Sequence, residues 1–195
     1  PALNARTAPN MVLPTVHVQR GDAAQALKNA PHQLQSQLEI GGQEHYYLEG
    51  QIAYVLPQDD GEWLVHASTQ HPGEAQHWVA HALGVPLHRV RVLCRRMGGG
   101  FGGKETQSGH PAVWAALAAR KTGRPVKMRL SREDDFLVTG KRHPFSHDFQ
   151  AGFDDQGRLL SLHSTQWAHC GFSADLSGPV SDRAVFHTDN AYFLE

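Results

Sequence analysis

The residues of this chain with the clearest potential for chemistry lie in a glycine-rich run from Arg95 to Gln107, which reads RRMGGGFGGKETQ. Five of its 13 residues are glycines, and they stand around Phe101. Glycine reaches backbone conformations that other residues avoid, and it lets a ligand approach the main chain closely. Loops of this kind hold anions and oxygen-rich ligands with backbone N–H groups. The carboxylate of Glu105 follows the glycines and adds a second hydrogen-bonding group.

Two nucleotide-binding patterns and a glycine turn without a ligand compete for this run. Gly98, Gly100 and Gly103 fit the dinucleotide pattern G-x-G-x-x-G. That pattern also needs a lone carboxylate about 20 residues further on, and the segment at that distance fits poorly. Gly98, Gly103 and Lys104 fit most of the phosphate-loop pattern, but Glu105 occupies the position of the hydroxyl that binds magnesium.

The histidines and cysteines do not form a convincing metal or nucleophile motif. His77 and His81 are one helical turn apart, yet no third ligand accompanies them, and four-coordinate sites need more. Cys94 and Cys170 lie far apart without a metal spacing. We expect Cys94 to be a buried thiol. We therefore expect no metal ion to be held directly by side chains of this chain.

Composition is that of an ordinary globular protein, with 40% hydrophobic residues, 19% charged residues and a net charge of −1. Residues 89–142 carry 13 of the 18 Lys and Arg but only four acids, so this segment is +9 and the remainder −10. Charged and apolar residues alternate along the strands expected there, which favours a solvated sheet face over a nucleic-acid surface. No apolar run is long enough for a membrane span. We expect no nucleic acid and no membrane among the partners, and a reducing, cytoplasmic setting.

Hydrophobic periodicity predicts the elements that position the glycine-rich run. Strands are expected over residues 32–40, 51–56, 63–67, 88–94, 126–130, 146–153 and 159–167, with hairpin turns at 59–61 and 154–157. Helices are expected over residues 21–30, 73–83 and 111–121, and Ser131 with Asp134 resembles a capping box for a further short helix. The helix over 111–121 is apolar nearly all round, so we expect it to be buried. The order predicts an α+β fold of mixed or antiparallel sheets packed with a few helices.

The string RMGGGFGGKET resembles the molybdenum-cofactor loop of the xanthine dehydrogenase and xanthine oxidase family. Other segments match the family in order and spacing, namely IGGQEHYYLE at 40–49, STQHP at 68–72, KTGRPV at 121–126, TGKRHPF at 139–145 and DNAY at 189–192. The resemblance covers roughly residues 15–195. The spellings STQHP and KETQ are most similar to bacterial enzymes whose cofactor-binding part is a separate large subunit.

The family's cofactor-binding subunit is several times longer than this chain. The resemblance therefore implies an internal fragment, with residues 1–20 as a linker or lead-in segment. Residues 21–195 would form the incomplete, N-terminal part of the molybdopterin-binding domain. We expect the isolated fragment to be inactive, because the family's general-base glutamate and most cofactor contacts lie downstream of it.

The resemblance also implies roles for individual residues. The backbone around Gly100, Phe101 and Gly102 would bind an oxygen of the molybdenum cofactor, and Phe101 would wall the site. Gln70 would donate a hydrogen bond to an oxygen on molybdenum from the other side. Glu105 would contact the substrate by hydrogen bonding to the purine ring. The alternative for Glu105 is a carboxylate at the start of the following helix, favoured there by the helix dipole.

Enzymes of the family hydroxylate hypoxanthine and xanthine to urate with oxygen from water. The resemblance thus implies a parent xanthine dehydrogenase with a molybdopterin cofactor in this subunit. Electrons would pass to NAD through iron–sulfur clusters and FAD on a small partner subunit, in a hetero-oligomer. Two alternatives stay open: aldehyde oxidation within the same superfamily, and a nucleotide-binding module built on the glycine-rich loop.

Overall fold

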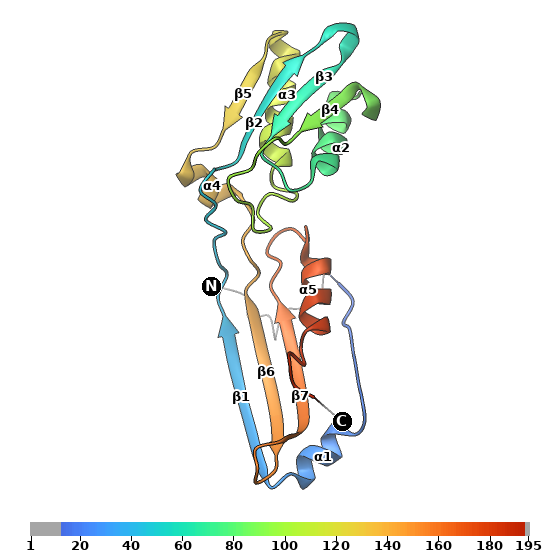
Figure 1. Ribbon diagram of the computed structural model, residues 1–195, viewed down its shortest axis with the longest axis vertical. Coiled ribbons are helices and arrows are strands. Elements are labelled where there is room, and N and C mark those ends of the chain that lie inside the picture. The colour runs from blue at the N-terminus through green and yellow to red at the C-terminus, as the bar shows by residue number, and fades with distance from the viewer. Residues whose placement is uncertain (1–12, 194–195) are drawn as a thin grey trace. The chain divides into compact units, whose positions relative to one another are not determined.

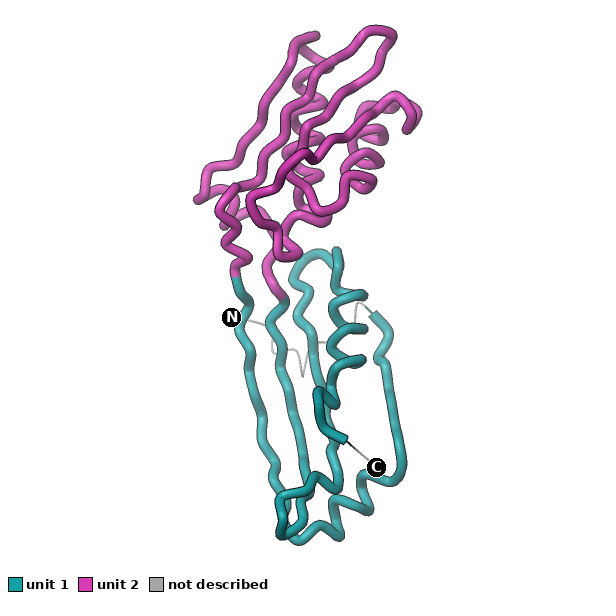
Figure 2. The backbone as a smooth tube through the Cα atoms, viewed as in Figure 1, with its two compact units in different colours: residues 1–43, 143–195 teal, residues 44–142 magenta. Residues whose placement is uncertain are grey.

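The computed structural model describes residues 13–193, which form two compact units (Figure 2). Unit 1 combines residues 1–43 with 143–195, and unit 2 is residues 44–142. Most of the lead-in expected over residues 1–20 lies outside the described residues, so its boundary with the domain stays a prediction. The chain leaves unit 1 after its first strand, builds unit 2, and returns to pair its next long strand with that first one.

Unit 1 is built on a three-stranded antiparallel sheet in the order β1-β6-β7. Its strands are β1 (His32–Ile40), β6 (Phe145–Phe153) and β7 (Leu159–Ala168), and its helices are α1 (Ala23–Asn29) and α5 (Ser177–Phe186). Helix α1 lies so close to the sheet that a Cβ on Gly152 would stand 2.7 Å from the Cβ of Ala30. All nine residues of β1 are exposed, so this strand forms an open edge.

Unit 2 is a four-stranded sheet in the order β4-β3-β2-β5. Its strands are β2 (Ile52–Pro57), β3 (Trp63–Ala67), β4 (Val90–Leu93) and β5 (Val126–Arg129). Strands β3 and β4 run parallel, whereas β2 pairs with both of its neighbours in the antiparallel sense. The helices are α2 (Pro72–Leu83), α3 (Gly109–Thr122) and the short α4 (Arg132–Val138).

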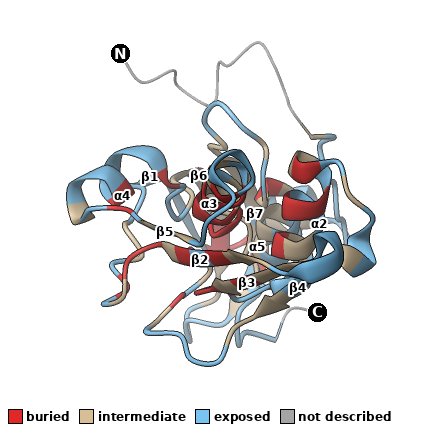
Figure 3. Cartoon of the chain, turned by 90° about the horizontal axis from the view of Figure 1, so that it is seen from above, coloured by how far each residue is buried: buried red, intermediate tan, exposed pale blue. Residues whose placement is uncertain are grey.

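The core of unit 2 lies between its sheet and the helices α2 and α3 (Figure 1). Alternation in β2 and β3 points Val55 and Val65 toward the helices, and both are fully buried. Four of the six buried residues of α3 are alanines, whose small side chains let the helix pack closely on the sheet. Figure 3 shows buried residues gathered on α2, α3 and the strands beneath them.

The predicted α+β architecture is confirmed, and so are both hairpins, the strand over 32–40 and the helix over 73–83. The cap at Ser131 is also confirmed, because its side chain accepts a hydrogen bond from the Asp134 N–H. The strand expected over 88–94 is shorter, because residues 87–89 form a 3₁₀ turn before β4 begins. Complete burial of the helix over 111–121 was wrong. Trp114 and Leu117 are 42% and 44% exposed, since only the alanine face of α3 packs against the sheet. Helix α5 was not predicted.

Candidate functional site at the glycine-rich loop

The glycine-rich loop joins the end of β4 to the start of α3, and it meets the segment that follows β3. Because β3 and β4 are parallel neighbours, both leave the sheet at the same edge. Residues Ser68 to Gln70 therefore lie beside the loop. The backbone N–H of Gln70 donates to the carbonyl oxygen of Lys104 at 2.9 Å, which joins the two segments directly.

The side chain of Gln70 is held by the loop backbone. Its amide oxygen accepts from the N–H of Gly102 at 2.9 Å and from the N–H of Lys104 at 3.2 Å. Gly100 leaves the space for this arrangement, because a Cβ there would stand 2.6 Å from the Gln70 Cδ. Gln70 is exposed, and its amide nitrogen donates no hydrogen bond within residues 13–193. That nitrogen is therefore free to donate to a ligand.

Phe101 stands at the tip of the loop in an unusual conformation. Its φ angle is 56°, a left-handed value that is uncommon for any residue other than glycine. Its side chain is 74% exposed, although it is a large apolar group. Gly102 follows with φ 92°, a conformation that suits glycine. Strain of this kind persists only where the surrounding structure holds it, and it is typical of ligand-binding loops.

An ion pair between the buried Lys104 and the partly exposed Glu49 fixes the two ends of the loop. The Lys104 side chain is fully buried, and its ammonium donates to the Glu49 backbone oxygen at 2.6 Å, to the Ser68 hydroxyl at 2.8 Å and to the Glu49 carboxylate at 3.2 Å. The carboxylate also accepts from the Ser68 hydroxyl and from the N–H of Gly98. Burial opposes ionisation of Glu49, but these hydrogen bonds and the charge of Lys104 outweigh it and lower the pKa of the carboxyl.

A second buried network supports the loop at Gly103. The Asp135 carboxylate accepts from the Tyr47 hydroxyl at 2.6 Å and from the Gln51 N–H at 3.2 Å. The Gln51 amide nitrogen then donates to the Gly103 carbonyl at 2.8 Å. Burial, with the hydrogen bond to Asp135, raises the pKa of Tyr47 far above its usual value, so this hydroxyl keeps its proton.

Glu105 is half-buried and lies on the same side of the loop as Gly102. Its Oε1 would be 4.0 Å from a Cβ placed on Gly102. Helix α3 begins only at Gly109, and its first turn has no acidic residue. The alternative role for Glu105, a carboxylate stabilised by the helix dipole, therefore finds no support. The loop gathers Gln70, Phe101, Gly102 and Glu105 around one exposed backbone segment.

Residues 4–195 match the family model described as molybdopterin cofactor-binding domain. The chain belongs to this family. It is 44% identical over 180 residues to a xanthine dehydrogenase/oxidase of Mus musculus, and 40% identical over 178 residues to a xanthine dehydrogenase of Drosophila subobscura. These matches cover 92% and 91% of the chain but only 14% and 13% of the relatives. The chain thus spans about one seventh of the length of the relatives it matches.

Solved structures of two oxidoreductases share this fold. An aldehyde oxidoreductase from Desulfovibrio gigas aligns with a TM-score of 0.73 and 25% identity, over 84% of this chain and 18% of that one. A quinoline 2-oxidoreductase from Pseudomonas putida 86 aligns with a TM-score of 0.66 and 23% identity, over 75% of this chain and 19% of that one. The second likeness shows the fold alone.

The residues at the loop fit a molybdopterin cofactor that presents oxygen atoms to them. The Gln70 amide nitrogen and the N–H of Phe101 make no hydrogen bond within the described part of the chain, and both stand at an exposed surface. They are donors suited to an oxygen acceptor. In this structure the N–H of Gly102 is already bonded to Gln70, so its expected contact with the cofactor stays a prediction.

The same geometry argues against a nucleotide module. A phosphate loop uses its lysine to reach the phosphates, whereas all three N–H donors of the Lys104 ammonium are bonded inside the protein. A dinucleotide site places the glycines at a helix N-terminus. Here α3 begins at Gly109, six residues after Gly103.

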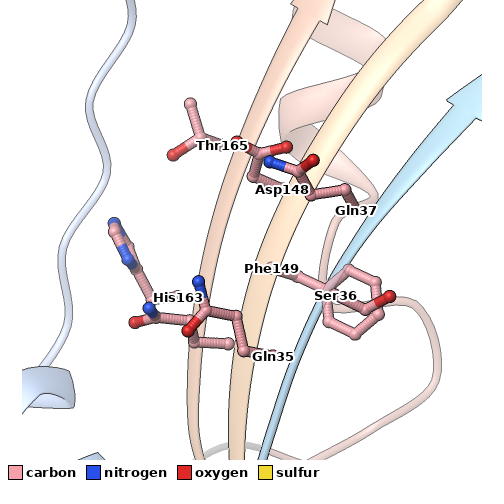
Figure 4. Close-up of a pocket in the computed structure, with 8 residues that line it drawn as sticks. Gln35, Ser36, Gln37, Asp148, Phe149, His163 and Thr165 are labelled. Carbon is pink, nitrogen blue, oxygen red and sulfur yellow. The ribbon is translucent and has the colours of Figure 1, made fainter.

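Other candidate groups gather no comparable chemistry. Within residues 13–193, no three His, Cys, Asp or Glu side chains are placed to hold a metal ion. Both cysteines are free, and Cys94 is half-buried rather than buried as expected. No helix in this range has the length and apolar character of a membrane span. A polar cavity of about 200 Å³ lies on the sheet of unit 1, where Gln35, Asp148 and His163 project from three neighbouring strands (Figure 4).

Sequence patterns did not reveal the residues that hold the loop in place. Glu49 and Lys104 lie 55 positions apart, and Tyr47 and Asp135 are 88 apart, so their pairing depends on the tertiary fold. One signal was present. Lys104 directly follows a six-residue run that contains five glycines, and a long charged side chain at the end of such a permissive run can anchor it.

Proposed function

We propose that this chain is the cofactor-facing part of a molybdenum hydroxylase of the xanthine dehydrogenase type, which hydroxylates hypoxanthine and xanthine to urate. One observation carries the proposal. Gln70, Phe101, Gly102 and Glu105 meet at an exposed loop whose surroundings fit an oxygen-bearing cofactor. The 44% identity to a xanthine dehydrogenase/oxidase supports the same function.

In this proposal the residues of the chain bind the cofactor and orient the purine. The molybdenum cofactor, when bound, supplies the two-electron oxidation of a ring carbon with oxygen from water. Gln70 donates its free amide N–H to a cofactor oxygen, and the backbone at Gly100 to Gly102 lines the same side. Phe101 forms an apolar wall that limits water around the reacting ring. The Glu105 carboxylate accepts a hydrogen bond from a ring N–H, or donates one to a ring oxygen or nitrogen when protonated.

The wider assembly also belongs to the proposal. The parent enzyme would carry iron–sulfur clusters and FAD on a small partner subunit, within a hetero-oligomer, and would pass electrons to NAD. We place it in the cytoplasm. These assignments rest on the resemblance to xanthine dehydrogenases, because the chain itself spans about one seventh of such proteins.

Replacement of Glu105 in the parent enzyme tests the proposal. Glu105→Gln removes a charge-assisted hydrogen bond, which contributes about 1.5–3 kcal/mol, or about a 10- to 150-fold change in kcat/KM. Molybdenum content should stay normal, and the loss should differ among purines that present different groups to the carboxylate. Glu133→Gln is the matched control, because this exposed carboxylate on α4 makes the same chemical change away from the loop. Equal kinetics in the two variants would remove Glu105 from the substrate site.

Aldehyde oxidation is the second candidate, favoured by the likeness to the aldehyde oxidoreductase of Desulfovibrio gigas. The two candidates differ in the use of Glu105, because an aldehyde has no ring nitrogen for the carboxylate to contact. Steady-state kinetics of the parent enzyme on xanthine and on an aromatic aldehyde separate them. Purine oxidation predicts a higher kcat/KM for xanthine and a loss in Glu105→Gln that is confined to purines.

A further inference from the structure

The two ends of the glycine-rich loop converge on a single carboxylate. Glu49 accepts from the Gly98 N–H at 2.9 Å, where the loop begins, and from the Lys104 ammonium at 3.2 Å, where it ends. The Glu49 N–H also donates to the Gly98 carbonyl at 3.1 Å. The five residues between Gly98 and Lys104 are thus a closed loop whose span is set by Glu49. Four of them are glycines, with little conformational preference of their own.

The peptide groups of Lys104 determine where Gln70 lies. The Lys104 N–H donates to the Gln70 amide oxygen at 3.2 Å, and the Lys104 carbonyl accepts from the Gln70 N–H at 2.9 Å. The same carbonyl accepts from the hydroxyls of Thr69 and Ser108. A displacement of Lys104 would therefore move the Gln70 main chain and its amide together.

We infer that Lys104 and Glu49 are positioning residues, which act through the loop to aim the Gln70 amide nitrogen and the Phe101 backbone at the cofactor. The inference rests on the proposed function, since it names what holds the cofactor-facing groups in place. Neither residue contacts the cofactor in this inference. Lys104 is fully buried and has no free donor, and Glu49 uses its carboxylate on Gly98, Ser68 and Lys104.

A charged pair serves this role better than an apolar contact would. A methionine at position 104 would fill similar space, but it would remove the hydrogen bonds of the ammonium to the Glu49 carbonyl, the Glu49 carboxylate and the Ser68 hydroxyl. In Glu49→Gln the fully buried Lys104 ammonium would lose its counter-charge, so the loop would have to rearrange. The glycines of the loop have little conformational preference, so they would allow such a rearrangement.

The test compares Lys104→Met, Glu49→Gln and Leu83→Ala in the parent enzyme. Leu83 is a buried core residue at the end of α2, and its variant serves as a control that lowers stability through the core. Three quantities are measured: the melting temperature, hydrogen exchange of the peptide spanning residues 97–108, and kcat per bound molybdenum. Glu49→Gln keeps the shape of the carboxylate, and its partial exposure makes it the milder change if Lys104→Met does not fold.

In both loop variants the amide hydrogens of residues 97–108 should exchange faster, by about tenfold or more. Opening of the loop then no longer has to break the Lys104–Glu49 ion pair. Their kcat per molybdenum should fall on the order of 10- to 100-fold, as expected for misplaced groups near the reacting atoms. Combination of Lys104→Met with Gln70→Ala should add little to the kinetic effect, since the lysine acts through Gln70. Leu83→Ala should lower only the melting temperature.

Loop exchange and kcat equal to those of Leu83→Ala at a matched melting temperature would overturn the inference. So would full additivity of Lys104→Met with Gln70→Ala. A parent enzyme without molybdenum or purine oxidation would instead refute the proposed function. The exchange measurement would still decide the positioning role in that case, because it needs no bound cofactor.

Discussion

Gly100 offers a direct way to move the Gln70 side chain without altering it. In Gly100→Ala, the new Cβ would overlap the Gln70 side chain, with its Cδ 2.6 Å away. Gly100 has no positive φ angle, so alanine is compatible with the backbone there. Gln70 is exposed, so its side chain has room to rotate away from the loop without disrupting the fold.

The magnitude follows from the bonds that Gln70 would lose. Two neutral hydrogen bonds, from the N–H groups of Gly102 and Lys104, each contribute about 0.5–1.5 kcal/mol. Alanine restricts the unfolded chain and returns about 0.4–1 kcal/mol, which leaves a net loss of stability of about 0–2.6 kcal/mol. The displaced amide nitrogen would lose its hydrogen bond to the cofactor. Loss of one neutral hydrogen bond should lower kcat/KM about 2- to 13-fold.

The assay is steady-state purine oxidation by the parent enzyme, with a melting curve for each variant. Gly73→Ala is the matched control, because nothing lies within 4 Å of its Cβ position near the start of α2 and its φ is not positive. This control should be slightly more stable and kinetically unchanged. In a Gln70→Ala background, Gly100→Ala should have no further kinetic effect. A full additional loss in that background would refute the reasoning.

Three further predictions concern the same loop, the fragment and the titrating histidines. Gly102→Val should abolish activity of the parent enzyme even where the fold survives, because a β-branched residue disfavours φ 92° and intrudes on the exposed face; near-normal turnover would show that this face does not meet the cofactor. The isolated chain should neither retain molybdenum nor oxidise xanthine, and elemental analysis of the purified chain checks this. Burial lowers the pKa of His45, His143 and His147, so folding disfavours their protonated forms. Their contribution to stability should be complete above the usual pKa of 6.5 and decline as pH falls below it, and a melting series from about pH 8 to about pH 5 that stayed flat would contradict this.

Local sequence signals were sufficient for most elements of the fold. The alternation that places Val55 and Val65 on one face is visible in the sequence, and it predicted β2 and β3. The cap at Ser131 follows from the hydroxyl's ability to accept from the N–H three residues on. Helix α5 lacks such signals, because its run SGPVSDRAVF contains Gly and Pro near the start and buries only Ser177.

Long-range contacts explain what the sequence did not predict. The pairing of β1 with β6 joins residues on either side of all of unit 2, and no local pattern encodes such a pairing. Exposure of Trp114 depends on which layers cover α3, whereas periodicity reports only that the helix is apolar. At the site, the resemblance predicted roles for Gln70 and Glu105, and these roles stay predictions. It did not identify the Glu49 and Lys104 pair, since charge pairing in space has no fixed spacing along the chain.

The burial of Lys104 has a consequence for chemical labelling. The other four lysines, at positions 28, 121, 127 and 141, are exposed, so amine-reactive reagents and trypsin can reach them in the folded protein. Lys104 can react only when the loop opens and releases its ammonium from Glu49. Its labelling rate, compared with those four internal references, therefore measures the opening equilibrium of the loop. Mass spectrometry of a single digest would read that equilibrium without any cofactor, substrate or turnover assay.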